Sequence, residues 1–451
     1  MIKAMERREF LKISGAAALA AACAPKTAQS KGTKEEGPEQ MVYRDNPKNG
    51  DRVSLLGFGC MRWPMIKDDD GKDVIDQEAV NQMVDYAIEH GINYFDTSPA
   101  YLQGLSEQAA GIALSRYPRS SYYIATKLSN FGDQSPKASL EMYRNSFRQL
   151  NTDYFDYYLL HAIGRGGKDA FNQRYVQNGM LDFLRAEKAA GRIRNLGFSF
   201  HGAKHEFDYF MELFDSGEMI WDFVQIEMNY VDWKHADGVR NVNADYLYEE
   251  LDKRELPIVI MEPLLGGRLA NVPEGIARQM KEREPDKSIA SWAFRFCGTY
   301  PRVLCALSGM TNMDPLMDNV KTFGHFQPLT PEELDFLEQM AVQMKEYPLI
   351  NCTDCKYCMP CPWGIDIPGT FQHYNRAVTE GTYAQSKDQK DYAKLKKAYL
   401  VSYDRAVPTV RQADHCIACG ECLSHCPQSI AIPGQLRRIA RYIENLKQDL
   451  L

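Results

Sequence analysis

Eight short runs rich in β-branched and aromatic residues recur along this chain, and each is followed by a longer segment with helical spacing. The runs are VSLLGFGCM, INYFDTS, YYIATKL, YFDYYLLHA, IRNLGFSFH, DFVQIEMNY, PIVIMEPL and VLCALSGM. Segments between them, such as 77–90, 139–150 and 179–190, have the apolar spacing of amphipathic helices. Strand and helix that alternate eight times over about 300 residues predict a (β/α)8 TIM barrel of the α/β class. A doubly wound open sheet is the alternative, but LGFGCMR does not fit its usual glycine-rich turn.

Catalytic residues of such a barrel lie at the carboxyl ends of its strands or in the loops that follow. Neighbouring strand ends carry four polar side chains there: Asp96, Tyr101, Lys127 and His161. Each alone has a structural explanation, because an aspartate can cap a helix and a lysine can extend its amine to the surface. Together they make a coherent acid, since a nearby ammonium lowers the pKa of a tyrosine from about 10 and an aspartate keeps that ammonium charged. The histidine would direct a substrate oxygen toward the tyrosine.

Several stretches, in order along the chain, resemble the aldo-keto reductase family from about Val53 to Phe323. They are FDTSPAY with the later Ser106-Glu107, ATKL, SFRQLNTDYFDYYLLH, GRIRNLGFS, VQIEMNY, EPLLGGRLA, and LSGM with Asn319 downstream. The resemblance implies an oxidoreductase barrel over residues 41–345 that transfers hydride between a nicotinamide cofactor, NAD or NADP, and a small-molecule carbonyl or alcohol. In that pattern Tyr101 is the general acid, Lys127 and Asp96 tune it, and His161 orients the substrate.

The same resemblance implies a set of cofactor contacts. Ser199 and Gln225 would grip the nicotinamide carboxamide, and Leu264, Gly266, Gly309 and Asn319 would form parts of the pyrophosphate and adenosine site. The chain departs from the family nearby, because Met261 replaces the usual stacking aromatic residue and Phe200 replaces a polar residue that often follows the serine. Basic residues for the 2′-phosphate of NADP are absent from SGMTNMDPLMDN. The pattern therefore supports the proton-transfer residues better than tight NADPH binding.

Eight of the twelve cysteines lie in the runs CTDCKYCMPCP and CIACGECLSHCP. Disulfides, zinc and iron–sulfur clusters are the chemistries to compare. Adjacent C-x-x-C pairs rarely reach disulfide geometry several times in a row, and structural zinc often takes two such pairs from separate loops. A continuous run that ends in Cys-Pro instead suits [4Fe-4S] clusters, and its fourth cysteine then reaches the neighbouring cluster. We predict two [4Fe-4S] clusters, one on Cys352, Cys355, Cys358 and Cys426 and the other on Cys416, Cys419, Cys422 and Cys361.

The two cysteine runs look like halves of one repeated module over residues 346–451. Each run is followed by an Ile-x-Ile-Pro segment, IDIP or IAIP, and the residues between the runs have helical character. The module resembles the α-helical two-cluster ferredoxins, and the whole chain resembles a subgroup of aldo-keto reductases with such a tail. The resemblance implies electron exchange with a redox protein partner.

The first residues look like an export signal. Arg7-Arg8 precedes an apolar run over 13–22 that is too short to span a bilayer as a mature helix. We predict a twin-arginine signal peptide and tether over residues 1–31, with a chance amphipathic helix as the alternative. Cys23 follows LAAA and resembles a relaxed lipoprotein box, so lipidation of Cys23 with a membrane tether, or simple cleavage after an alanine, is expected. The twin-arginine route carries folded proteins and therefore suits clusters assembled inside the cell. The predicted location is periplasmic or lipid-anchored, and cytoplasmic is the alternative.

The predicted function is a carbonyl–alcohol oxidoreductase of the aldo-keto reductase type, coupled to electron transfer through the clusters. A net charge of −7 argues against general nucleic-acid binding. A hydride carries two electrons and each cluster one, and no stretch indicates a flavin site. A partner flavoprotein, purely structural clusters or another barrel cofactor would reconcile these counts. The alternative function is a non-catalytic or regulatory barrel fused to an electron-transfer module, which Met261 and Phe200 favour and the complete set of four polar residues opposes.

Overall fold

The computed structural model describes residues 40–236 and 241–451, and these residues belong to one compact unit. The predicted export signal and Cys23 lie outside the described residues. Among the helices of the described residues, none combines the length and the apolarity that a bilayer crossing requires.

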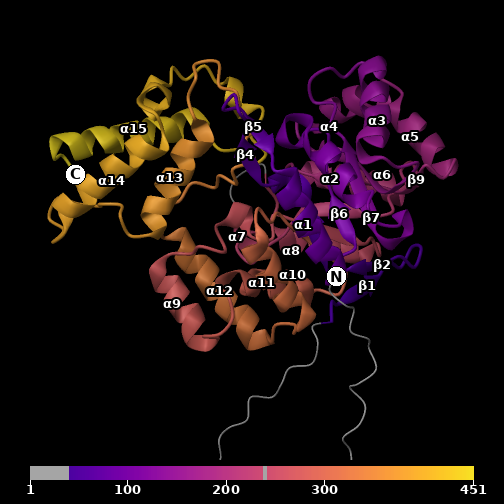
Figure 1. Ribbon diagram of the computed structural model, residues 1–451, viewed down its shortest axis with the longest axis horizontal. Coiled ribbons are helices and arrows are strands. Elements are labelled where there is room, and N and C mark those ends of the chain that lie inside the picture. Colours follow the sequence, from indigo (N-terminus) through magenta and orange to yellow (C-terminus); the bar gives the residue numbers. More distant parts are fainter. Residues whose placement is uncertain (1–39, 237–240) are drawn as a thin grey trace, which may run out of the picture. The chain divides into compact units, whose positions relative to one another are not determined.

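Eight parallel strands close into a barrel, which confirms the predicted (β/α)8 fold (Figure 1). Each of the predicted runs coincides with one of them, and only β8 extends one residue beyond its run: β3 (Leu56–Gly59), β6 (Tyr94–Asp96), β7 (Tyr123–Leu128), β8 (Phe155–Ile163), β9 (Ile193–Phe200), β10 (Val224–Glu227), β11 (Ile258–Met261) and β12 (Val303–Ser308). Each strand pairs with the next one in this order, and β12 pairs with β3 to close the barrel. Two antiparallel hairpins are added, β1 (Tyr43–Asp45) with β2 (Arg52–Ser54) and β4 (Met65–Lys67) with β5 (Asp73–Ile75).

Helices follow the strands along the chain and bury their apolar faces against the barrel core. They are α1 (Gln77–Glu89), α2 (Ser106–Leu114), α3 (Pro136–Leu150), α4 (Gly167–Phe171), α5 (Met180–Ala189), α6 (Lys204–Asp215), α7 (Asp232–His235), α8 (Ala244–Lys253), α9 (Glu274–Arg283), α10 (Ile289–Thr299), α11 (Met313–Gly324) and α12 (Pro331–Lys345). Helix α3 shows why such segments are helical. The Ser135 side chain caps its first turn, Pro136 occupies its first position, and Asn151 ends it in the left-handed conformation.

The carboxyl-terminal module is mainly helical, as predicted, and has its own hydrophobic core. Its helices are α13 (Ile367–Thr379), α14 (Tyr392–Ala406) and α15 (Ile432–Gln448), shown in orange and yellow in Figure 1. The repeated Ile-x-Ile-Pro segments have a common structural role. Pro368 and Pro433 each lie in the first turn of a helix, where a proline costs no hydrogen bond. Each cysteine run is therefore followed by a helix start.

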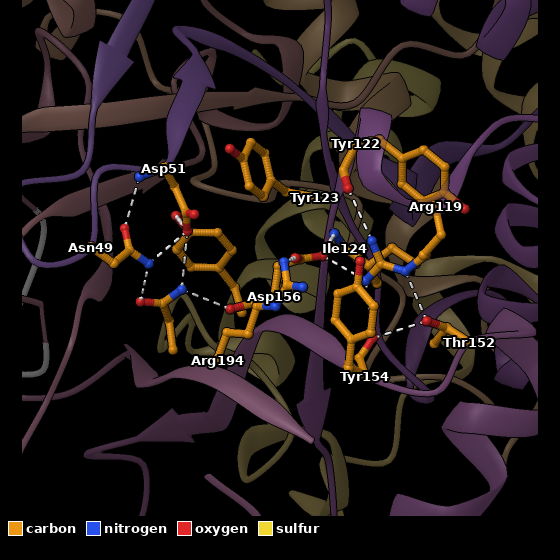
Figure 2. A network of polar contacts seen from close by, with 12 residues as sticks. Asn49, Asp51, Arg119, Tyr122, Tyr123, Ile124, Thr152, Tyr154, Asp156 and Arg194 are labelled. Carbon is orange, nitrogen blue, oxygen red and sulfur yellow. Dashed lines mark hydrogen bonds and ion pairs between the residues drawn. The ribbon is translucent and has the colours of Figure 1, made fainter. Parts of the chain in front are cut away.

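A polar network closes the amino-terminal end of the barrel, opposite the end where catalytic residues are expected (Figure 2). Asp156 of β8 is buried at its centre and accepts hydrogen bonds from Arg119 Nη2 at 2.6 Å, Arg194 Nη1 at 3.0 Å and the backbone amide of Ile124 at 2.9 Å. The network joins the first residues of β7, β8 and β9. Its expected role is therefore stability rather than chemistry.

Asp156→Ala is expected to lower the free energy of unfolding by about 2 to 3 kcal/mol, because two guanidinium groups and a buried amide lose their acceptor. Partial exposure of both arginines keeps the cost below that of a fully buried pair. Urea denaturation monitored by circular dichroism measures it, with Asp156→Asn as the control that retains one acceptor oxygen. A loss below about 0.5 kcal/mol would show that the network contributes no more than an exposed ion pair.

Candidate functional site

The mouth of the barrel gathers the four predicted polar residues from three consecutive strands. Asp96 ends β6, Lys127 lies near the end of β7, and His161 lies near the end of β8. Tyr101 begins the 3-10 turn Tyr101–Gly104 after β6. The Lys127 Nζ atom lies 2.6 Å from Asp96 Oδ1 and 5.0 Å from the centre of the Tyr101 ring. The rings of Tyr101 and His161 meet edge to face with centroids 5.9 Å apart.

Asp96 and Lys127 form a buried ion pair. Lys127 is 0% exposed and Asp96 2% exposed. Burial raises the pKa of the Asp96 carboxyl and lowers the pKa of the Lys127 ammonium, while the attraction between the two groups opposes both shifts. The Lys127 Nζ atom also donates to the Thr97 carbonyl at 2.9 Å, and Gln225 Nε2 donates to Asp96 Oδ2 at 3.2 Å. The pair is therefore held by hydrogen bonds on both sides.

The pKa of Tyr101 moves in the direction opposite to the prediction. Burial raises it well above its usual value, and the nearby Asp96 and Tyr357 groups raise it further. Lys127 does not reverse this shift, because its ammonium faces the Tyr101 ring and donates to Asp96 and a backbone carbonyl. The phenol consequently keeps its proton at neutral pH and can release it to a stronger base, such as a developing alkoxide.

His161 is held as a neutral ring at a bulge in β8. Burial lowers its pKa well below the usual value, and the positive charges of Lys127 and Arg174 act in the same direction. The Nδ1 atom lies 2.6 Å from Ser129 Oγ and 3.3 Å from Ser98 Oγ. Next to it, Ala162 has a positive φ of 52°, and the register between β8 and β9 shifts between Leu160 and Ile163.

Sequence reasoning did not single out Ser98 and Ser129. Ser98 lies two residues after Asp96, and Ser129 lies two residues after Lys127. Both serines follow the ends of β6 and β7, so the rule that the loops after the strands carry the site could have identified them. Their hydroxyls lie 2.8 Å from each other. They fix the orientation of the His161 ring.

Residues predicted to hold a nicotinamide dinucleotide make their contacts within the chain. Ser199 Oγ accepts from the Ala162 amide at 2.8 Å, and Asn319 Nδ2 donates to Ser308 Oγ at 2.9 Å. Gln225 is engaged by Asp96, as described above. Leu264 precedes the 3-10 turn Leu265–Gly267 and packs against the barrel core.

The two predicted cofactor glycines are covered by other residues. A Cβ atom on Gly266 would lie 2.4 Å from the Cα atom of Thr353 in the carboxyl-terminal module. On Gly309, a Cβ atom would lie 3.0 Å from the Arg62 side chain. Protein atoms thus cover both glycines, which the prediction assigns to the pyrophosphate and adenosine site.

Thiols of the first predicted cluster set lie together beside the barrel mouth. Burial raises the pKa of Cys355 to about 12, and the nearby Cys426 and Cys352 thiols add to this shift. Cys426, from the second run, likewise raises the pKa of Cys352 and of Cys358. The fourth cysteine of the second run therefore lies within electrostatic range of the first three cysteines of the first run, which is compatible with a crossed ligand set.

Thiols of the second predicted set line a hollow at the protein surface. Its walls include Cys361, Cys416, Cys419 and Cys422, together with Cys358, Trp363 and Ile417. Burial raises the pKa of Cys422 to about 11, and Cys416, Cys419 and Cys361 add to the shift. In residues 40–236 and 241–451 every cysteine is a free thiol, and no group of three or more potential ligands is arranged around a single metal ion. A four-iron cluster is wider than one ion, so the hollow and the grouped thiols fit such a cluster.

The module contacts the barrel mouth on two sides. On one side, Arg62 donates to the Thr353 carbonyl, and its Nη1 atom lies 3.6 Å from Asp354 Oδ2. On the other side, Arg165 donates to the Ser424 carbonyl at 2.5 Å. Gln428 Nε2 donates to Glu227 Oε1 at 2.6 Å.

Comparison with known proteins adds the following findings. The profile of the Aldo/keto reductase family matches residues 55–341, and the profile of the 4Fe-4S dicluster domain matches residues 351–431. A probable voltage-gated potassium channel subunit beta from Oryza sativa subsp. japonica is 24% identical over 344 residues, which cover 68% of this chain and 98% of the relative. An aldo-keto reductase from Bacillus halodurans, solved in its holo form, is 22% identical with a TM-score of 0.53. The match covers 67% of this chain and 96% of that chain. An aldo-keto reductase from Klebsiella pneumoniae in complex with NADPH is 20% identical with a TM-score of 0.51, and the match covers 67% of this chain and 95% of that chain.

Proposed function

This chain belongs to the aldo/keto reductase family and carries a carboxyl-terminal 4Fe-4S dicluster domain, and on that premise we propose that it interconverts a carbonyl and an alcohol at Tyr101, coupled to electron transfer through two [4Fe-4S] clusters. The observation that carries the proposal is the buried Asp96–Lys127 ion pair beneath the Tyr101 ring. A lysine ammonium at this depth is costly unless it is paired, as it is here with Asp96, and buried ion pairs in a cleft are candidates for function.

The residues of the site divide the proton chemistry between them. A substrate oxygen placed between the Tyr101 hydroxyl and the neutral His161 ring accepts hydrogen bonds from both. As negative charge develops on that oxygen, Tyr101 transfers its proton, and the Lys127 ammonium stabilises the phenolate that forms. Asp96 keeps Lys127 charged during the transfer. In the oxidation direction the phenolate accepts the alcohol proton.

The cysteines would hold the clusters at two distances from this pocket. When bound, such clusters supply or accept electrons one at a time. The set Cys352, Cys355, Cys358 and Cys426 would lie beside the barrel mouth, because Thr353, Asp354 and Tyr357 of the same run contact the barrel or the aromatic side chains of its mouth. The set with Cys361 would lie at the exposed hollow, where Cys419 is exposed and Trp363 is 55% exposed. We propose that a redox protein partner docks at this hollow.

A nicotinamide cofactor is the hydride donor that the family resemblance implies, and the Klebsiella relative carries NADPH. In this chain the residues proposed to bind it do not offer a free surface in the described conformation, because Thr353 and Arg62 lie on Gly266 and Gly309. Tyr101 would supply the proton that the substrate oxygen receives with either kind of donor. A hydride donor would also supply the hydrogen that the carbon receives, whereas single electrons from the clusters would require a second proton for that carbon.

Tyr101→Phe is expected to lower kcat/KM for carbonyl reduction by about a thousandfold, because the proton donor is lost while the pocket keeps its shape. Protein purified anaerobically is assayed against a panel of dicarbonyls and sugars, with NADPH, NADH or a reduced viologen supplied in turn as the reductant. Iron content and the cluster absorption spectrum serve as controls and are expected to stay unchanged. Equal activity of variant and wild type would rule out Tyr101 as the acid.

A second candidate is a regulatory barrel that binds a ligand without turning it over. The coverage of Gly266 and Gly309 favours it, and one relative is named as a channel subunit. Electron paramagnetic resonance during additions of NADH, NADPH or substrate separates the two. In a catalyst, the redox state of the clusters changes when substrate and reductant are added. In a regulatory barrel, the redox state changes only when a redox protein partner is added.

Export remains a proposal from the sequence pattern of residues 1–31. We propose export by the twin-arginine route and lipidation of Cys23. Fractionation of cells that express Arg7→Lys/Arg8→Lys and Cys23→Ser variants tests the two steps separately, since the first should retain the protein inside the cell and the second should release it from the membrane.

A further inference from the structure

The first cysteine run contacts the barrel at the place where the family resemblance puts the pyrophosphate of a dinucleotide. Gly266 has a φ of 67°, and a Cβ atom there would lie 2.4 Å from Thr353 Cα and 2.7 Å from Thr353 Cβ. Thr353 is 2% exposed. Backbone therefore lies directly on backbone, and no phosphate group fits between them.

Polar groups that could serve a phosphate are used to hold this run. Arg62 lies over Gly309, donates to the Thr353 carbonyl and pairs with Asp354 at 3.6 Å. The Gly266 amide donates to the Glu262 carboxylate at 2.7 Å. Arg268 Nη1 donates to Asn351 Oδ1 at 2.7 Å. Arg62, the Gly266 amide and Arg268 thus all bind the protein's own chain.

The same run also reaches the part of the barrel mouth where the family resemblance places the nicotinamide ring. Tyr357 lies between Cys355 and Cys358 in the sequence, and its ring centroid is 6.4 Å from that of Phe131, which in turn lies 5.0 Å from the His161 ring. The Tyr357 phenol is close enough to Tyr101 to raise its pKa. Tyr357 therefore lies at the edge of the pocket in which a nicotinamide ring would have to meet the substrate.

We propose that the segment 351–357 takes the place of the nicotinamide dinucleotide in the barrel mouth, so that docking of the iron–sulfur module and binding of a dinucleotide are mutually exclusive. The inference concerns binding alone and holds whether or not Tyr101 reduces a carbonyl. It follows from the close approach of Thr353 to Gly266 at one end of the segment and from the Tyr357 ring, which lies 6.4 Å from the Phe131 ring beside His161, at the other end. It also gives Tyr357 a position as a wall of the substrate pocket, supplied by the module.

Equilibrium dialysis of the anaerobic, cluster-loaded full chain with NADPH and with NADH tests the exclusion, together with hydrogen exchange of the amides in 351–358. The expected result is either no saturable binding up to about 1 mM, or binding accompanied by faster exchange in this segment, because the apparent affinity scales with the undocked fraction. Saturable binding with unchanged exchange in 351–358 would overturn the proposal.

The double variant Asn351→Ala/Asp354→Ala removes two ties that hold the segment, the contact of Asn351 with Arg268 and that of Asp354 with Arg62, and changes no residue of the barrel. It is expected to raise dinucleotide affinity about tenfold or more by increasing the undocked fraction. Lys356→Ala is the matched control, because this residue lies in the same run but is exposed and is not one of the two ties that the double variant removes. Iron content confirms that all proteins carry their clusters. If exchange shows the segment released in the double variant and affinity does not rise, the exclusion is wrong.

Discussion

Lys127→Met is expected to lower carbonyl reduction by at least about a hundredfold and to destabilise the fold by about 3 kcal/mol at pH 8. The loss of activity follows because the phenolate of Tyr101 would form without the ammonium that lies 5.0 Å from its ring. The loss of stability follows because Asp96, which is 2% exposed, would keep a buried charge without its cation. Activity assays and urea denaturation measure the two effects.

The stability loss in this variant depends on pH. Burial already raises the pKa of Asp96 in the folded protein, and removal of Lys127 takes away the attraction that opposes this shift. The folded variant then binds a proton more tightly than the unfolded chain, so its stability falls as the pH rises from about 4, the unfolded value, toward the folded pKa. We therefore expect a smaller deficit at pH 5 than at pH 8.

The double variant Asp96→Asn/Lys127→Met is the matched control. It removes both charges, so we expect it to recover at least about half of the lost stability while activity stays low. If Lys127→Met were equally stable at both pH values, or if the double variant were no more stable than the single one, the buried ion pair would not be the source of the effect.

Periodicity was sufficient to predict the barrel and the general place of the site. Each apolar run corresponds to one strand, and the carboxyl-end rule brought Asp96, Lys127 and His161 together because these residues lie at or near the ends of consecutive strands. The helical module followed from the cysteine spacing and from the helical character of the residues between the two runs, and the structure adds that the repeated segment starts a helix after each run. These features are local in sequence, so a pattern can reveal them.

Contacts between the module and the barrel could not be predicted in the same way. Gly266 was interpreted as a phosphate contact, yet its neighbour is Thr353, and no periodic pattern relates the two. The predicted direction of the Tyr101 pKa shift was also wrong, because the pKa depends first on burial, then on the charge of Asp96, and further on Tyr357 from the distant module. Such tertiary contacts depend on the shapes of two folded surfaces, which a pattern of residue types does not encode.

Cys361→Ser is expected to change the cluster held by the other run, lowering the iron content from about eight toward about four atoms per chain. Cys361 belongs to the first run but lines the hollow with Cys416, Cys419 and Cys422. Its substitution should therefore reproduce the electron paramagnetic resonance change of Cys419→Ser and differ from that of Cys355→Ser, which belongs to the set beside the barrel. Cys426→Ser should instead reproduce the resonance change of Cys355→Ser and differ from that of Cys419→Ser, because its thiol is close enough to Cys355 to raise the pKa of that thiol.

Cys297→Ser provides the control for the effect of losing any thiol, because Cys297 is buried in the barrel core and lies outside both runs. It should leave the iron content and the resonance spectrum unchanged. A crossed ligand set would tie the two cysteine runs to each other, so each cluster would fasten α13 to α15 in addition to the hydrophobic core that they share. If Cys361→Ser gave the spectrum of Cys355→Ser instead, each run would hold its own cluster and this coupling would not exist.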